Sequence, residues 1–143
     1  MTASAFSSLS LDPPLVLVCI KAGNYSYQLI EQVGSFAVNI LARSQEERSN
    51  RFAGGIVGDD GRWTPWPEDR DRFEGVDFSR GEHSGAALLD GSLASLDCKL
   101  ESILPGGDHG IFVGRVCATK LSEAESLEPL LYHGGSYGGF KRD

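Results

Sequence analysis

The chain has 143 residues, a formal net charge of −7 at pH 7 and 41% hydrophobic residues, values that fit one soluble domain with its own core. The negative charge repels a phosphate backbone, so no nucleic-acid partner is expected. No apolar run is long enough to span a bilayer and no secretory leader is recognisable, so no membrane association is expected.

The three cysteines, Cys19, Cys98 and Cys117, are odd in number and far apart in the sequence. They have neither C-x-x-C spacing nor a neighbouring histidine at ligand spacing, which argues against a metal site. Each lies in an apolar or alternating segment, so buried thiols on strands are predicted. This pattern favours the cytoplasm as the compartment.

The first segment, Thr2–Leu9, is rich in serine and threonine and predicts a strand that ends at the turn Asp12–Pro14. Alternation along that strand would place Ser8 and Ser10 on one face and Ser7 on the other. Two interpretations fit this pattern. The segment is either a polar edge strand or an edge whose hydroxyl groups bind a planar, polar ligand.

Leu15–Ile20 is a continuous apolar run and predicts a strand covered on both faces. The loop Lys21–Tyr25 follows. Ser26 is then predicted to cap a helix over Tyr27–Val33, which Gly34 ends. The helix start also offers free N–H groups beside a lysine and an asparagine, an arrangement that favours a phosphate. Capping and anion binding by Ser26 can coexist.

Phe36–Leu41 predicts another buried strand, and Ser44–Glu47 has the pattern of a capping box that starts a short helix. Gly54–Asp71 has no periodicity and is predicted to be a long loop or insertion. Its two tryptophans, Trp63 and Trp66, could cover a pocket, contact a second subunit or simply pack the loop against the domain.

Ser92–Ser102 alternates apolar and polar residues and predicts a strand. The turn Pro105–Asp108 separates it from a second strand, His109–Lys120, so that the two form a hairpin. His109 at this turn is either a structural residue or a functional one beside a pocket. Tyr137 lies in a glycine-rich tail and could be an anchor or a lid.

Many strands with only short helices predict a mainly β, barrel-like fold rather than alternating βαβ units. No nucleophile elbow, zinc-protease helix, phosphate-binding loop or dinucleotide fingerprint is present. Any redox or group-transfer chemistry would therefore depend mainly on a bound cofactor.

A series of short stretches also follows a recognisable order: Thr2–Leu15, Gly34–Leu41, Asp71–Val76, Leu88–Gly91, Gly107–His109, Val113–Val116, Pro129–Tyr132 and Tyr137–Gly138. In this order the chain resembles the flavin reductase-like family with an FMN-binding split β-barrel. Members of that family are reductase components of two-component flavin monooxygenases. The resemblance implies one flavin reductase-like domain over residues 1–143, with an insertion at 54–71.

The resemblance also implies roles for particular residues. Thr2, Ser4, Ser7 and Ser8 would lie along the isoalloxazine ring and ribityl chain of FMN or FAD, and Asp12 and Pro13 would shape the edge of that site. Lys21, Asn24 and Ser26 would bind the flavin phosphate. His109 would be the catalytic residue: it would lie near the nicotinamide of NADH or NADPH and orient the nicotinamide amide or the flavin rather than take a proton.

The implied activity is NAD(P)H-dependent flavin reduction, with hydride transfer from nicotinamide C4 to flavin N5. The implied partners are a second copy of the chain in a homodimer, with the flavin near the interface, and a flavin-dependent monooxygenase. Family members carry about two further strands before the segment that begins here at Thr2, so an N-terminally truncated barrel is expected. The alternatives are a flavin-binding module or redox sensor without turnover, and a β-domain with no cofactor.

Overall fold

The computed structural model describes residues 1–124 and 127–140. Its centre is a five-stranded antiparallel sheet with the strand order β1-β2-β9-β8-β3. The sheet strands are β1 (Phe6–Leu11), β2 (Pro14–Lys21), β3 (Ser35–Ile40), β8 (Ala94–Gly106) and β9 (His109–Leu121). The predicted mainly β fold class is confirmed, and within the described residues β1 and β3 form the two edges of this sheet.

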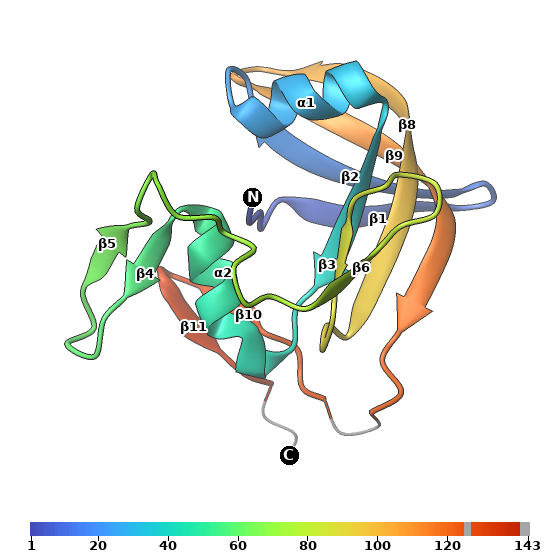
Figure 1. The fold of residues 1–143 in the computed structure, drawn as a ribbon. Coiled ribbons are helices and arrows are strands. Elements are labelled where there is room, and N and C mark those ends of the chain that lie inside the picture. Colours follow the sequence, from blue (N-terminus) through green and yellow to red (C-terminus); the bar gives the residue numbers. More distant parts are fainter. Residues whose placement is uncertain (125–126, 141–143) are drawn as a thin grey trace.

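The sheet curls around its core, and helix α1 (Tyr25–Val33) closes one end of it (Figure 1). We call the core-lining face of the sheet the inner face and the opposite one the outer face. The buried core residues on the inner face are Val16, Val18, Ile20, Phe36, Cys98 and Phe112. Tyr27 and Ile30 of α1 pack against them, so the helix completes the core.

Two glycines of β9 allow aromatic rings to approach the inner face closely. The ring of Tyr27 meets that of Phe112 edge-on, with centroids 4.8 Å apart. A Cβ atom at Gly110 would lie 2.7 Å from the Tyr27 ring, and one at Gly114 would overlap the ring of Phe36. Larger residues at these positions would therefore push α1 and β3 away from the sheet.

Helix α1 begins earlier than predicted, and its N-cap is Asn24 rather than Ser26. Asn24 has an extended backbone, and its carbonyl accepts the N–H groups of Tyr27 and Gln28, which is the bonding expected of a residue at the N-cap. The predicted C-terminus is confirmed, because Gly34 adopts the left-handed conformation with φ of 73°.

The β1–β2 hairpin carries a bulge that alters the expected faces. β1 begins at Phe6 rather than Thr2, and its register shifts between Ser8 and Ser10. Ser8 pairs with the buried Val16 on the inner face, whereas Ser10 pairs with Leu15 on the outer face. The prediction that Ser8 and Ser10 share a face is wrong, because the bulge adds one residue to β1.

The predicted hairpin of β8 and β9 is confirmed, with Gly107 and Asp108 at its turn. Of the cysteines, only Cys98 is fully buried; Cys19 and Cys117 are half-buried, and all three are free thiols. Similarly, only the inner face of β2 is fully buried, and its outer residues Leu15, Leu17 and Cys19 are half-buried.

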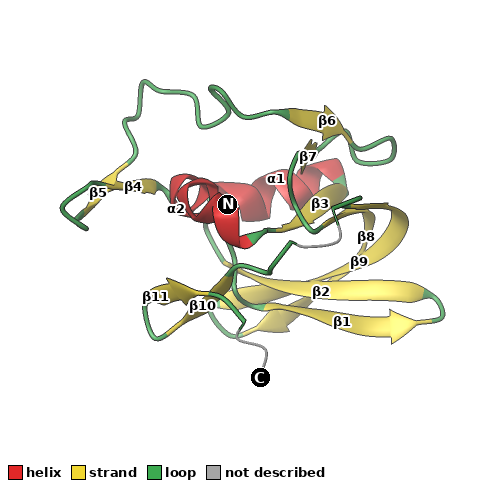
Figure 2. Cartoon of the chain, turned by 90° about the horizontal axis from the view of Figure 1, so that it is seen from below, coloured by secondary structure: helices red, strands yellow, loops and turns green. Residues whose placement is uncertain are grey.

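The outer face of β3 and β8 is covered by a segment with the short strands β6 (Phe78–Arg80) and β7 (Ala87–Leu89) (Figure 2). Asn39 holds this segment: its amide nitrogen donates to the carbonyl of Ala87, and its amide oxygen accepts the N–H of Leu89 at 2.8 Å. The hydroxyl of Ser95, which is also buried, donates to the same amide oxygen. Ser95 and Asp97 therefore form an interior polar layer on the outer face of β8, whereas Lys99 and Glu101 further along the strand are exposed.

Asp97 is the second anchor of this segment and is only 1% exposed. Its carboxylate accepts the backbone N–H groups of His83 at 2.8 Å and Ser84 at 3.0 Å. Burial alone would raise the pKa of Asp97, but hydrogen bonds from Ser84 and His83 outweigh it and hold the pKa below the ordinary value. A Cβ atom at Gly81 would meet this carboxylate at 2.6 Å.

A second group of elements lies beside the sheet, around helix α2 (Glu46–Ala53) and the one-turn helix η1 (Arg43–Gln45) (Figure 1). It includes the hairpins β4 (Gly55–Val57) with β5 (Trp63–Pro65), and β10 (Leu131–His133) with β11 (Ser136–Gly138). The predicted capping box at Ser44–Glu47 is wrong, because Gln45 precedes α2 and its side chain accepts the N–H of Ala42 instead.

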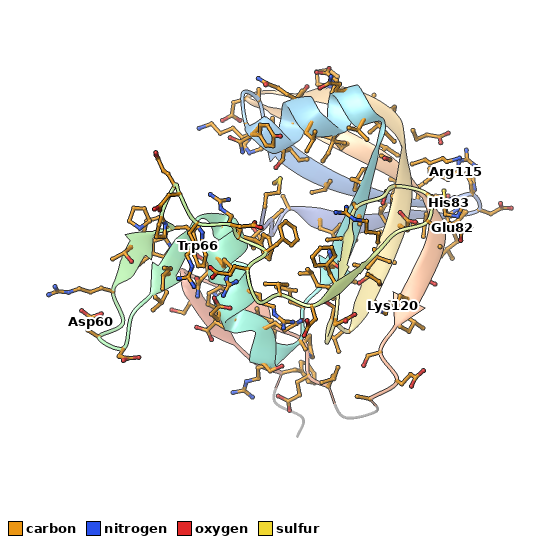
Figure 3. All side chains as sticks on the ribbon, in the orientation of Figure 1. Asp60, Trp66, Glu82, His83, Arg115 and Lys120 are labelled. Carbon is orange, nitrogen blue, oxygen red and sulfur yellow. The ribbon has the colours of Figure 1, made fainter. Side chains whose placement is uncertain are left out.

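The segment Gly54–Asp71 is not a structureless loop, because it contains the β4–β5 hairpin. Trp66 is buried, and its indole N–H donates to the carbonyl of Arg70 at 2.8 Å. Figure 3 shows Trp66 beside α2 and Asp60 at the outer tip of the hairpin. Trp66 therefore packs this segment against the domain, while Trp63 is 54% exposed.

Asp97→Asn is expected to destabilise the protein by about 2 kcal/mol at pH 7, because one of two buried N–H donors loses its acceptor. The Asp97 carboxylate contributes fully to the free energy of unfolding above its ordinary pKa of about 4. This contribution is lost as the pH falls through the lowered pKa of the folded state. Urea unfolding of both proteins between pH 7 and pH 3 should show the difference shrinking toward the acid end. The exposed Asp69→Asn variant should match the wild type throughout; an equal loss there would contradict this assignment.

Candidate functional site

Several residues predicted to bind a ligand lie at one end of the sheet. Lys21 at the end of β2 pairs with His109 at the start of β9. The turn after Lys21 is joined to the β8–β9 turn, because the N–H of Ala22 donates to the carbonyl of Asp108 at 2.9 Å. Asn24 and α1 follow directly, so the predicted phosphate-binding loop and the predicted nicotinamide-binding histidine are neighbours.

The strand register also places predicted site residues on a common face. Ser7 pairs with Leu17, which pairs with Val113. The pair of Lys21 and His109 lies four residues further along, an even number, and therefore on the same side of the sheet. Ser7, Lys21 and His109 therefore belong to the outer face. Ser8 belongs to the inner face, so the two adjacent serines cannot meet the same side of a flat ligand.

His109 is held by its neighbour in the turn. Its Nδ1 lies 2.8 Å from Oδ1 of Asp108. This hydrogen bond lowers the pKa of Asp108 below its ordinary value. Because a carboxylate only accepts, Nδ1 carries the hydrogen and Nε2 is left for a ligand. Asp108 thus fixes both the tautomer and the orientation of the ring.

The start of α1 meets the requirements of an anion site. The cap carries no side-chain hydrogen bond, and the first turn holds no acidic residue. Within residues 1–124 and 127–140, the N–H groups of Tyr25 and Ser26 have no hydrogen-bond partner. Together with the exposed ammonium group of Lys21, they form a donor set that suits a phosphate group.

Thr2 lies away from the sheet, against the last turn of α2. Its N–H donates to the carbonyl of Phe52 at 3.1 Å, and its hydroxyl donates to the carbonyl of Ser49 at 2.6 Å. The first of these bonds satisfies a carbonyl of the last helical turn, which has no partner within the helix. Because the Thr2 hydroxyl donates its proton to the Ser49 carbonyl, its oxygen can only accept a hydrogen bond from a ligand. Ser4 is exposed between Thr2 and β1.

Asp12 and Pro13 are not brought to the same end as the other predicted residues. They form the turn between β1 and β2, at the opposite end of β2 from Lys21. β2 is 8 residues long, which separates the two ends by roughly 25 Å at about 3.3 Å per residue. The predicted role of Asp12 and Pro13 would therefore require a ligand that follows the whole length of the hairpin.

Two features of this arrangement were not predicted from the sequence: the hydrogen bond that orients the His109 ring and the contact between Thr2 and Ser49. For the first, the adjacency of Asp108 and His109 in a tight turn was an available signal. The contact of Ser49 with Thr2 had no signal, because it joins residues far apart in the chain. Tyr137 proves to be an anchor, since its hydroxyl donates to the Ser49 hydroxyl at 2.9 Å.

The thiol of Cys98 lies in the core and not among these residues. Burial raises the pKa of the Cys98 thiol to about 12, which leaves it protonated and unreactive. The described part of the chain holds no cluster of histidine, cysteine and carboxylate side chains suited to a metal ion. No helix among the described residues is long and apolar enough to cross a membrane.

Comparison with known proteins places these observations in a family context. Residues 1–141 match the family described as "Flavin reductase like domain". The chain is 40% identical over 139 residues to the reductase subunit HsaB of a flavin-dependent monooxygenase from Rhodococcus jostii, covering 97% of this chain and 63% of that protein. It is also 38% identical to an NADH-dependent FAD reductase of Streptomyces globisporus, covering 100% of this chain and 72% of the relative.

Solved structures agree with the sequence matches. The chain superimposes on the Streptomyces globisporus NADH:FAD oxidoreductase SgcE6, determined in complex with NAD and FAD fragments, with a TM-score of 0.83. The sequence identity is 34%, and the match covers 100% of this chain and 78% of the other. The chain thus spans less than two thirds of HsaB and about three quarters of the Streptomyces proteins.

Proposed function

Because the chain belongs to the flavin reductase-like family, we propose that it is an NAD(P)H:flavin oxidoreductase that reduces FMN or FAD for a flavin-dependent monooxygenase. The names of HsaB and of the NADH-dependent FAD reductase support this activity and this kind of partner. The SgcE6 complex with NAD and FAD fragments supports NADH and a flavin as the two ligands.

The neighbouring positions of Lys21 and His109 give this proposal its main structural support. The β2–β9 register places Lys21 beside His109, so a phosphate-binding group and an oriented imidazole lie at the same end of the outer face. A flavin and a nicotinamide held together need such a combination of anion binding and polar orientation. No strong general base is required, since the bound nicotinamide and flavin supply hydride transfer from C4 to N5.

The residues of the chain then have distinct tasks. The N–H groups at the start of α1, with Lys21, Asn24 and Ser26, hold the flavin phosphate. His109 presents Nε2 to the nicotinamide carboxamide, because Asp108 holds Nδ1. Ser7 and Ser4 offer hydroxyl groups to the isoalloxazine ring and ribityl chain from β1 and the segment before it. Thr2 accepts a hydrogen bond from the same ligand.

We also propose that the protein forms a homodimer through the outer face of the sheet. The half-buried side chains of Leu17, Cys19 and Ile111 line this face beside Leu104, which is 50% exposed. A second copy on these residues would bury apolar surface and cover the neighbouring Lys21 and His109. Water would then be excluded from the proposed hydride-transfer site. The free, unpaired thiols fit a cytoplasmic location.

The proposed activity is tested by mixing the protein with NADH and free FMN or FAD under low oxygen and following flavin absorbance. The wild type should bleach the flavin far faster than a protein-free blank. His109→Ala should lower kcat/KM for NADH by about tenfold, the loss of one well-made hydrogen bond, with a smaller effect on flavin affinity. His133→Ala, in the exposed strand β10, should behave as the wild type.

No acceleration over the blank would refute the reductase assignment. Flavin binding without NADH oxidation would identify a binding module or redox sensor instead, and then His109→Ala would change nothing.

The phosphate site is tested by comparing FMN with riboflavin, which lacks the phosphate. Lys21→Ala should weaken FMN binding by about five- to tenfold, because an exposed ammonium–phosphate contact is lost, and should leave riboflavin binding unchanged. Flavin fluorescence quenching measures both affinities. Lys99→Ala removes an exposed charge elsewhere on the sheet and serves as the control. Equal losses for FMN and riboflavin would place the phosphate elsewhere.

The homodimer is tested by measuring molecular mass in solution by sedimentation. Leu104→Glu should shift the protein from dimer to monomer, since a charge would be buried in the proposed interface. Leu121→Glu is the matched control: Leu121 is 70% exposed at the far end of β9 and its variant should remain dimeric. A wild type that is monomeric at micromolar concentration would contradict this interface.

A further inference from the structure

We propose that Tyr137 is a positioning residue for the segment that carries Thr2, and that it acts through Ser49. This inference rests on the proposed function, because the flavin contact of Thr2 belongs to that proposal. The hydroxyl of Tyr137 donates to the hydroxyl of Ser49 at 2.9 Å. The carbonyl of the same serine accepts the hydroxyl of Thr2 at 2.6 Å. Three segments far apart in the sequence therefore meet at one buried residue.

Ser49 is suited to transmit position because it cannot move freely. It lies within α2, it is 3% exposed, and both of its oxygen atoms take part in this chain of contacts. A shift of the last turns of α2 would displace the carbonyls of Ser49 and Phe52 together. Thr2 is bonded to both carbonyls, so it would follow that shift.

The hairpin that carries Tyr137 is fixed independently of its hydroxyl. The β10–β11 pair brings Tyr132 opposite Tyr137, with ring centroids 4.9 Å apart. The chain before β10 is bonded to the start of η1: the N–H of Arg43 donates to the carbonyl of Glu128 at 2.8 Å, and their side chains form an ion pair at 2.9 Å. Removing only the Tyr137 hydroxyl should therefore leave the hairpin folded.

A tyrosine on this hairpin is thus connected to the protein's opening segment through Ser49 of α2. If the hydroxyl only stabilised the fold, its loss would affect thermal stability and both substrates alike. If it positions Thr2, its loss acts on flavin binding, because the segment from Thr2 to Ser4 is the proposed flavin contact. Binding of NADH, which depends on His109 at the β8–β9 turn, should be spared.

The experiment measures flavin dissociation constants by fluorescence quenching, and steady-state KM and kcat for flavin and NADH, in Tyr137→Phe. We expect the flavin dissociation constant and the flavin KM to rise by about three- to tenfold, the range set by one hydrogen bond. The value of kcat and the KM for NADH should stay within about twofold of the wild type. Tyr132→Phe, which removes a hydroxyl from the ring packed against Tyr137, is the matched control and should bind flavin normally.

A double-mutant cycle separates positioning from general stabilisation. Tyr137→Phe and Thr2→Val should each weaken flavin binding, and together should weaken it by little more than Thr2→Val alone, because they act along one chain of contacts. Thr2→Ser keeps the hydroxyl and should restore wild-type affinity.

Additive effects, or a lowered Tm with unchanged flavin affinity, would overturn the positioning role. A wild type that turns over flavin while Tyr137→Phe is indistinguishable from it would refute this inference alone. A wild type without flavin binding would refute the proposed function itself.

Discussion

The register between β2 and β9 is the constraint on which the proposed site depends. Val18 lies opposite Phe112, and Gly110 and Gly114 leave space for the rings of Tyr27 and Phe36. A slip of one residue would bring a bulky side chain under an aromatic ring and would turn His109 to the other face. The packing of the inner face therefore decides which side chains stand together on the outer face, although none of the proposed ligand-binding residues belongs to the core cluster.

Local patterns in the sequence predicted the elements that depend on local interactions. The alternation over Ser92–Ser102, the turn before His109 and the glycine that ends α1 are each determined within a few residues, and all are confirmed. The resemblance of ordered motifs then predicted the family, which the match over residues 1–141 confirms. The roles assigned to individual site residues are still predictions.

The sequence-based predictions were wrong where an inserted residue or a segment distant in the chain determines which face, cap or burial a residue has. The bulge in β1 follows from its pairing with β2, so strict alternation wrongly placed Ser8 and Ser10 on one face. Asn24 displaces Ser26 as the cap because its own carbonyl receives the first helical bonds. The alternation along β8 did not show which of its polar residues are buried: N–H groups of the segment 78–92 bind the buried Asp97, whereas Lys99 stays exposed.

The carboxylate of Asp97 binds the neighbouring loop through main-chain N–H groups, and this has a consequence for how the protein can vary. Every amino acid except proline supplies such a group, so the exposed side chain at position 83 can change while the loop stays attached. Gly81 is constrained by the space it leaves for the carboxylate, and Ser84 by its hydroxyl, which accepts the N–H of Ala86. The loop is thus a surface on which new side chains can be introduced, by natural variation or by design, without rebuilding the sheet beneath it.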